Sequence, residues 1–412
     1  MDNMAGKPPI GALSGIRVLD MSRILAGPWA TQLLGDLGAD VLKIEKPGAG
    51  DDTRGWGPPF VGEGPDSDAA YFTCANRNKA SVTLDFTKPE GGEILRKLIP
   101  QHHIFVENFK TGGLKKYGLD YESVSAINPA IVYCSITGFG QDGPYANRAG
   151  YDYLVQAAGG LMSVTGQADG TPGAEPLKVG VAVADLFTGM YATVAILAAL
   201  RHADATGQGQ HLDLSLLDCQ TAMLANQGAN FLVSGVAPTR LGNAHPNIAP
   251  YQVFETSDGH VVLAVGNDGQ FRSFCDVAAL PEAKADARFE TNALRVANRT
   301  ALIALLAPAL KARTTADWIA ALETAKVPCG PINTVDQVFA DPQVIARGMK
   351  HDMIRADGTS LPLVANPIKM SVTPPLPRFA PPSLGADTDA RLGDLLGLSE
   401  AQLTHLRSQG II

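Results

Sequence analysis

Asp185 has the most distinctive chemical setting in this 412-residue sequence. It is the lone carboxylate in the apolar stretch VAVADLFTG, at the expected start of a helix. A helix dipole favours an anion at the N-terminus, and an ionised carboxylate there is able to attack a thioester carbonyl and form a covalent acyl intermediate. An aspartate in this place is also typical of a plain helix N-cap. The residues alone leave both interpretations open.

Sequence signatures of several other chemistries are missing. The segment MSRILAGPWA, which follows the first predicted strand, lacks the G-x-G-x-x-G of dinucleotide binding. There is no Walker loop, no G-x-S-x-G elbow and no HExxH motif. His102 and His103 are adjacent, so their side chains face different directions and make a poor metal pair. We therefore expect no metal site.

The elements that must position Asp185 alternate between strands and helices. The short β-type runs are 16–20, 39–45, 103–109, 130–140 and 210–216, and the main helical segments are 89–99, 182–201 and 217–235. Strands separated by helices form parallel sheets. The predicted fold class is therefore α/β, a Rossmann-like doubly wound parallel sheet, in which ligands bind at the carboxyl ends of the strands.

The predicted order of strands and helices changes in the second half of the sequence. Residues 1–225 form the predicted large domain. Residues 240–325 read as a smaller α+β domain, with a β-hairpin around Ser257-Asp258-Gly259 and helices at 271–280 and 299–326. Residues 326–412 contain Pro-rich connectors such as VTPPLPRFAPPSLG, which must run extended over a surface.

Composition excludes several classes of protein. The net charge is −8 without a basic stripe, which argues against a nucleic-acid partner. The longest apolar run, 190–200, is too short to cross a membrane and predicts a buried helix. Five scattered cysteines without a CxxC pair indicate a reducing compartment. The first residues also lack the pattern of a signal peptide, so we expect a cytoplasmic protein.

Long motifs across the whole chain resemble the class III CoA-transferase family, the group of formyl-CoA transferase, carnitine CoA-transferase and α-methylacyl-CoA racemase. They are GIRVLDMSRILAGPWATQLLGDLGADVLKIEKPGAGDDTRGWG, YFTCANRNKASVTLD, VENFKTGGLKKYGL, VYCSITGFGQDGPYANRAGYDYLVQAAGG, KVGVAVADLFTGMYA, GNAHPNIAPYQVF, VPCGPINTVDQVFADPQV and LGADTDARLGDLLGL. The resemblance implies a large domain built from the N-terminal half and the C-terminal tail, with a small domain between them. It also implies an interlocked homodimer.

The resemblance assigns roles to individual residues. Asp185 stands at the position of the family's nucleophile. CoA or acyl-CoA is then bound as a substrate, with no permanently bound cofactor and no metal. The residues in segments that match CoA contacts are Arg23, Lys46, Arg77, Leu84, Asn108, Gly113, Lys116 and Tyr117. Those expected to contact the carboxylic acid substrate are Tyr151, Asn243 and His245.

Departures from the family's motifs bear on the choice of reaction. The racemase branch has a histidine base where this chain has Tyr151, and a tyrosine with a pKa of about 10 is a poor base for an α-proton. Formyl-CoA transferase has a glutamine where this chain has Leu25. We expect CoA transfer from an acyl-CoA such as succinyl-CoA to a carboxylic acid such as a dicarboxylate. The alternatives are an acyl-CoA racemase or isomerase and a non-catalytic CoA-binding protein.

Overall fold

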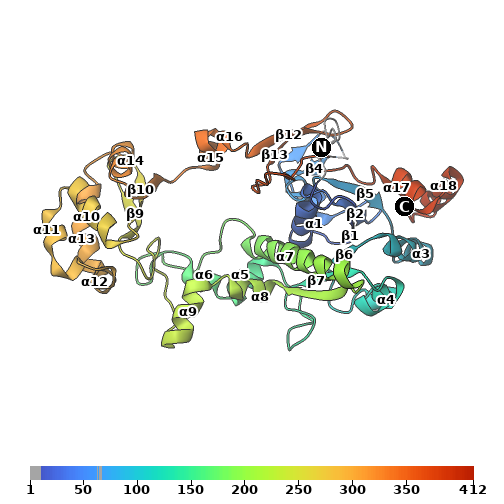
Figure 1. Ribbon diagram of the computed structural model, residues 1–412, viewed down its shortest axis with the longest axis horizontal. Helices are drawn as coiled ribbons and strands as arrows, with labels where there is room; N and C mark the ends of the chain where they lie inside the picture. The colour runs from blue at the N-terminus through green and yellow to red at the C-terminus, as the bar shows by residue number, and fades with distance from the viewer. Residues whose placement is uncertain (1–10, 63, 65–66) are drawn as a thin grey trace, which may run out of the picture. The chain divides into compact units, whose positions relative to one another are not determined.

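The computed structural model describes residues 11–62, 64 and 67–412 (Figure 1). The chain forms two compact units, and each is described by itself. The first unit comprises Met1–Gly159, Gly180–Met223 and Pro342–Ile412. The second comprises Gly160–Val179 and Leu224–Asp341, so the predicted small-domain range of 240–325 lies inside it. The predicted large-domain range of 1–225 is wrong for Gly160–Val179, which belongs to the second unit.

A six-stranded sheet is the centre of the first unit. Its order is β5-β2-β1-β6-β7-β8, and every neighbouring pair is parallel. The strands are β1 (Arg17–Asp20), β2 (Asp40–Glu45), β5 (Lys79–Thr83), β6 (Ile104–Glu107), β7 (Val132–Thr137) and β8 (Gln210–Ser215). The chain reverses its direction of winding between β1 and β6, where parallel sheets of this order bind their ligands.

Helices cover both faces of this sheet, which confirms the predicted α/β, doubly wound architecture. On one face lie α1 (Ala26–Asp36), α5 (Asp152–Ala158), α7 (Val183–Thr206) and α8 (Leu216–Ala222). On the other lie α3 (Pro89–Leu98), α4 (Tyr121–Ile127), α17 (Thr388–Leu396) and α18 (Glu400–Ser408). Because successive strand residues point to opposite faces, Leu19 and Phe105 enter one core while Val18 and Val106 enter the other.

α7 is the helix that carries Asp185. By length and composition alone, it is the one helix in the described part of the chain that could cross a membrane. Its buried residues recur every three or four positions and face α1 and the sheet. At Gly189 the two helices are so close that an added Cβ would lie 2.7 Å from the Ala26 carbonyl oxygen. The predicted buried helix over 190–200 is thus part of α7.

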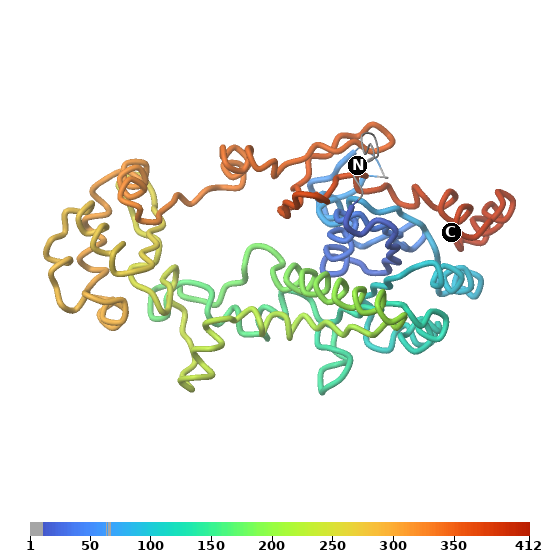
Figure 2. The backbone as a smooth tube through the Cα atoms, viewed as in Figure 1, coloured from blue at the N-terminus to red at the C-terminus, as the bar shows by residue number. Residues whose placement is uncertain are grey.

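The C-terminal stretch returns to the first unit. Figure 2 shows it in orange and red beside the blue N-terminal part of the chain. The backbone N–H groups of Arg378 and Phe379 donate to the Asn78 side-chain oxygen, at 2.7 and 2.9 Å. Ile411 and Ile412 are buried in the core under α3.

The smaller elements of this unit are β3 (Phe60–Val61), β4 (Asp68–Ala69), α2 (Ala70–Thr73), α16 (Pro342–Ala346), β12 (Lys350–Ile354) and β13 (Ser360–Val364), with 3-10 turns η1 (Asp52–Gly55), η2 (Ile99–Gln101) and η3 (Lys115–Tyr117).

The second unit has its own hydrophobic core, between an antiparallel sheet and a group of helices. The sheet has the order β11-β10-β9, with β9 (Tyr251–Glu255), β10 (His260–Ala264) and β11 (Cys329–Pro331). The predicted hairpin is therefore present as β9 and β10. The remaining elements are α6 (Leu161–Val164), α9 (Ala225–Ser234), α10 (Asp268–Val277), α11 (Pro281–Ala285), η4 (Ala287–Phe289), α12 (Asn292–Ala297), α13 (Arg299–Leu310), α14 (Thr315–Thr324) and α15 (Val335–Ala340).

Two long helices that the sequence predicts are each divided in the structure. The segment 217–235 becomes α8 and α9, and Ala225 has a positive φ of 45° where the path changes. The segment 299–326 becomes α13 and α14, because the Thr314 side chain caps a new helix by accepting from the Asp317 N–H. The strand β5 lies in a segment for which the sequence analysis predicted no strand.

Candidate active site

A cavity of about 490 Å³ opens at the carboxyl ends of β1, β6 and β7, where the sheet reverses its winding. Asp185 lines it together with the loops after these strands. The lining side chains that carry charge are Arg23, Lys110, Lys116, Arg148 and Asp185. A site with four cations and one carboxylate suits an anionic ligand and an anionic nucleophile.

The carboxyl group of Asp185 has an unusual charge state. Asp185 is the third residue of α7 and is partly buried. Burial raises the pKa of this carboxyl group, and the negative charge of Asp152 raises it further, to about 7. Strongly shifted carboxyl groups that line a cavity are typical of functional sites.

Asp152, rather than Asp185, caps α7. The Asp152 Oδ1 accepts hydrogen bonds from the backbone N–H groups of Ala184, at 2.8 Å, and Asp185, at 3.4 Å. The residue at the N-cap position, Ala182, has no side chain able to cap. The N-cap interpretation of Asp185 is therefore wrong, because its place in the first turn leaves its own carboxyl group facing the cavity.

Tyr71 lies near the two aspartates. Burial raises the pKa of its phenol, and the negative charge of Asp185 is the largest electrostatic contribution to a final value of about 12. The Tyr71 ring packs edge-on against Trp56 at 5.4 Å between centroids. The Tyr71 hydroxyl group therefore stays neutral, and able to donate a hydrogen bond, at every physiological pH.

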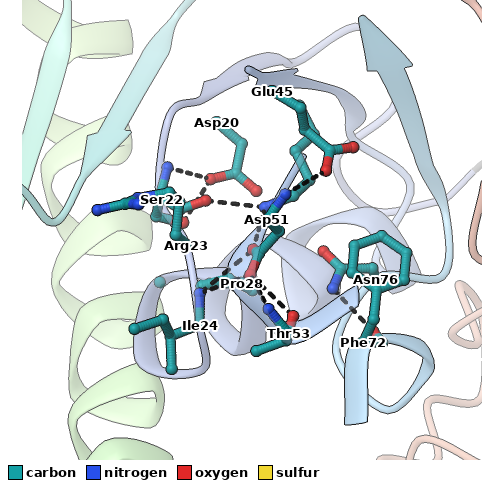
Figure 3. A network of polar contacts seen from close by, with 12 residues as sticks. Asp20, Ser22, Arg23, Ile24, Pro28, Glu45, Asp51, Thr53, Phe72 and Asn76 are labelled. Carbon is teal, nitrogen blue, oxygen red and sulfur yellow. Dashed lines mark hydrogen bonds and ion pairs between the residues drawn. The ribbon is translucent and has the colours of Figure 1, made fainter. Parts of the chain in front are cut away.

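Buried charges hold the loop that follows β1 (Figure 3). Both Asp51 oxygens accept from the Ile24 N–H at 3.2 Å, and Ile24 has a positive φ of 71°. Lys43 donates to the Ser22 carbonyl oxygen at 2.8 Å and to Asp51 at 2.9 Å. Although burial raises the pKa of Asp51, Lys43 and the Thr53 hydrogen bonds lower it to about 2. This network fixes a backbone shape that a β-branched residue rarely adopts.

A second pair of charges supports the end of β1. The Lys79 ammonium group donates to Asp20, Asn76 and the Pro28 carbonyl oxygen, at 2.9 to 3.1 Å. Asp20 also accepts from the Ser22 and Thr31 hydroxyl groups. The start of α1 is thereby tied to the end of β1 and the start of β5.

The loop after β6 closes the other side of the cavity. The Asn108 side chain accepts from the Arg23 N–H at 2.9 Å and donates to the Arg23 carbonyl oxygen at 2.7 Å. Phe109 lines this cavity and also a neighbouring cavity of about 330 Å³. Lys46 and Leu84 line that neighbour.

Most of the residues predicted to contact CoA thus lie around these two cavities. Arg23, Asn108, Gly113, Lys116 and Tyr117 line the larger cavity with Asp185, and Arg23, Lys46 and Leu84 line the smaller one. Tyr151, which was predicted to contact the carboxylic acid substrate, also lines the larger cavity. Because Arg23 and Phe109 belong to both linings, the two cavities are adjacent. Together they offer an elongated molecule one end near Asp185 and the other near Lys46.

The structure corrects the prediction that Arg77 contacts CoA. Its guanidinium group is buried and lines neither cavity. It makes a bidentate ion pair with Asp36, at 2.8 and 2.5 Å, and donates to the Val364 carbonyl oxygen at 2.9 Å. Its role is therefore to tie the C-terminal return to α1, and its charge is already satisfied by Asp36.

The two residues predicted to orient the acceptor acid, Asn243 and His245, lie in the second unit. His245 is held locally: its Nδ1 accepts from the Asn247 N–H at 3.1 Å, and its ring lies 5.2 Å from that of Tyr251. Arg299 donates to the His245 carbonyl oxygen at 2.6 Å. The structure thus gives these residues an ordered loop, and their role stays a prediction.

The sequence analysis missed several residues of the site. Lys110 and Arg148 line the larger cavity as additional cations. Asp152 was visible only as part of the AGYD motif, and its capping bond joins residues more than thirty positions apart. Tyr71 is the first residue of the motif YFTCANRNKASVTLD, and nothing in the sequence spacing connects it to Asp185.

Comparison with known proteins identifies the family. A match to the profile of CoA-transferase family III covers residues 13–388. The chain belongs to CoA-transferase family III. The chain is therefore a CoA-transferase, and the resemblance in the motifs is confirmed.

Individual relatives of this CoA-transferase are similar over nearly their whole length. A protein of Agrobacterium fabrum named succinate–glutarate CoA-transferase is 51% identical over 94% of this chain and 96% of its own. The human succinyl-CoA:glutarate CoA-transferase is 42% identical over 98% and 90%. The crystal structure of a CaiB/BaiF family protein from Brucella suis has 50% identity and a TM-score of 0.83, over 94% of this chain and 100% of that one.

Proposed function

We propose that this CoA-transferase moves CoA from succinyl-CoA to a dicarboxylic acid, with Asp185 as the covalent carrier. The observation that carries the proposal is the place of Asp185, a carboxyl group with a pKa of about 7 in a cavity lined by four cations. The names of the relatives support the substrate class, since two of them are succinate- or succinyl-CoA:glutarate CoA-transferases.

The reaction proceeds in balanced steps. The ionised Asp185 attacks the acyl carbon of the donor thioester, the carbon–sulfur bond breaks, and a mixed anhydride and CoA thiolate form. The thiolate attacks the aspartyl carbonyl carbon, which gives an Asp185–CoA thioester and releases the donor acid as a carboxylate. The acceptor carboxylate attacks the aspartyl carbonyl carbon of this thioester, the carbon–sulfur bond breaks, and a second mixed anhydride and CoA thiolate form. The thiolate then attacks the acceptor acyl carbon, which gives the new acyl-CoA and frees Asp185.

The surroundings of Asp185 serve these steps. α1 begins at Ala26 in the cavity lining without a side-chain cap, so its first N–H groups supply positive partial charge for the oxyanion of each tetrahedral intermediate. Lys110, Lys116 and Arg148 compensate the phosphate charges of CoA in a protein of net charge −8. Water must be excluded, since the anhydride hydrolyses readily.

The assembled enzyme is, in this proposal, a cytoplasmic homodimer with no permanently bound cofactor. α7 exposes large apolar side chains on the face that is turned away from its own core, namely Phe187, Met190, Tyr191 and Val194. An exposed apolar stripe of this kind is typical of a protein–protein interface. Asn243 and His245 are assigned to the acceptor acid.

The test is the intact mass of the protein after mixing with succinyl-CoA, together with CoA transfer to glutarate. The parent protein gains the mass of CoA or of the acyl group, whereas Asp185→Asn gains neither and loses transfer by at least about 10³-fold. Asp204→Asn, at the exposed end of the same helix, is the matched control and keeps both properties. Retained transfer in Asp185→Asn contradicts the proposal. Exchange of the substrate α-proton without any acceptor acid would instead indicate the racemase alternative.

A further inference from the structure

Glu107 is a buried carboxyl group that none of these steps uses. It is the last residue of β6 and is 6% exposed. Its Oε2 accepts from the Phe109 N–H at 2.7 Å, and it shares a hydrogen bond with the Ser135 hydroxyl group. Among the described residues no lysine or arginine forms an ion pair with it. Burial of a carboxylate without a cation strongly favours its neutral form.

A chain of hydrogen bonds leads from Glu107 across the sheet. Ser135 pairs with Glu107 in the register of β6 and β7, and its hydroxyl group lies 2.9 Å from the His211 Nε2. The His211 ring stacks on Tyr121 at 5.1 Å and meets Tyr133 edge-on at 5.5 Å. This chain is able to reverse: a neutral Glu107 donates to Ser135, and an ionised Glu107 accepts from it.

Glu107 also shapes the loop that lines both cavities. Its bond to the Phe109 N–H turns the chain directly after the strand. The turn places Asn108 against the Arg23 backbone and Phe109 between the two cavities. The Phe109 ring then packs edge-on against Phe86 at 5.7 Å. A change in the charge of Glu107 therefore acts directly beneath the proposed CoA site.

We infer that Glu107 is a positioning residue whose hydrogen bond from the Phe109 N–H holds the 108–113 loop for CoA, and whose ionisation weakens CoA binding by adding a negative charge beneath the site. The inference rests on the proposed function, since it needs CoA in these cavities. The hydrogen bond from the Phe109 N–H fixes the position of the loop. Because no described cation pairs with Glu107, the charge of the ionised carboxylate would be left uncompensated. The effect falls on CoA affinity and not on the chemistry at Asp185.

The titratable groups around Glu107 agree with this direction. Burial raises its pKa to about 7, against the hydrogen bonds from Ser135 and Phe109, and the charge of Asp213 adds to the rise. The other titratable neighbours are Tyr133 and Cys134 on β7 and His211 on β8. Burial raises the pKa of the first two and lowers that of His211, so all three stay uncharged near pH 7. Above neutral pH an ionised Glu107 repels the CoA phosphates, by about three- to tenfold in affinity.

The experiment measures the Kd of dephospho-CoA by calorimetry from pH 6 to pH 8.5, in the Asp185→Asn background. Dephospho-CoA is used because a phosphomonoester such as the 3′-phosphate of CoA titrates near pH 6, and Asp185→Asn removes the other carboxyl group that titrates near pH 7. We expect affinity to fall by about three- to tenfold as pH rises. Adding Glu107→Gln, which keeps an acceptor for the Phe109 N–H and a donor for Ser135, abolishes the fall and preserves the tight binding.

Two further variants separate charge from structure. Glu107→Ala loses the bond to Phe109 and weakens binding at every pH. Glu90→Gln removes the same charge from the exposed start of α3 and leaves the pH dependence unchanged. The same slope in Glu107→Gln as in its background overturns the inference. Absence of CoA binding in the parent protein at any pH would contradict the proposed function instead.

Discussion

At the scale of single residues, Asp152 has two effects on Asp185 that pull in different directions. Its carboxylate caps α7 and so fixes the turn from which Asp185 projects. The same negative charge keeps a larger share of Asp185 protonated near neutral pH. A protonated carboxyl group is not a nucleophile, so the cap costs reactivity at low pH.

Asp152→Asn separates these two effects. The amide keeps an oxygen for the Ala184 N–H and removes the charge. Because a nearby negative charge raises the pKa of a carboxyl group, the variant lowers the pKa of Asp185 from about 7. The acidic limb of the rate profile for adduct formation, measured from pH 5.5 to 8.5 at saturating succinyl-CoA, then moves to lower pH by about one unit.

The control for this prediction is Asp204→Asn, which removes an exposed charge from the other end of α7. Its profile coincides with that of the parent protein. An unshifted or upward-shifted limb in Asp152→Asn would show that the Asp152 charge does not act on the nucleophile. Circular dichroism of both variants shows whether the overall helix content is unchanged.

At the scale of elements, the place of Asp185 depends on how closely α7 approaches α1. Gly189 lies one turn after Asp185 and so shares its helix face. It packs against the Ala26 carbonyl oxygen and the Trp29 side chain, next to the loop that lines the cavity. A side chain at this position would push the two helices apart.

Gly189→Ala tests this contact, and two effects oppose each other in it. Helix propensity alone favours alanine by about 1 kcal/mol. The new Cβ would lie 2.7 Å from a backbone oxygen, and overpacking of this kind costs about 1–3 kcal/mol. We expect a net loss of stability in urea denaturation and a lower kcat with little change in KM. Ala205→Val, in the exposed last turn of α7, is the control, and a stabilised, fully active Gly189→Ala would contradict the argument.

The elements also show what the sequence could and could not predict. Strands such as β1, β2 and β7 were predicted within a few residues, because continuous apolar runs bounded by turns are a local signal. β5 was missed, since KASVT begins with a lysine that is buried only through its pairing with Asp20. The break before α14 depends on one capping threonine. Most of the cavity residues came from the motifs, although Lys110 and Arg148 were missed. The roles of Arg77, Asp152 and Tyr71 depend on contacts between distant segments that no local pattern shows.

At the scale of the whole molecule, the first unit is completed by the C-terminal segment Pro342–Ile412, which is far from the sheet strands in sequence. The side chains of Arg77, Asn78 and Arg54 donate to backbone carbonyl oxygens of the 364–382 stretch. α17 and α18 then complete the core on one face of the sheet. Both cavities lie at the carboxyl ends of the strands. The core beneath the sheet is therefore complete only when the C-terminal segment has packed against it.

Ile411 and Ile412 test this dependence. Both are buried in the core that contains Leu95 and Phe105, and the Ile411 carbonyl oxygen accepts from the Asp85 N–H at 2.7 Å. Truncating a buried isoleucine to alanine costs about 2–5 kcal/mol, so the double variant Ile411→Ala/Ile412→Ala loses several kcal/mol of unfolding free energy in urea. Ile354→Ala/Val372→Ala removes similar volume from exposed positions of the same unit and changes stability by less than about 1 kcal/mol. If both double variants unfold at the same urea concentration, the return segment does not stabilise the unit. If only the buried double variant is destabilised, we expect its CoA affinity and its Asp185 adduct formation to fall together as the temperature rises. Both cavities are formed by loops of the sheet that this core supports.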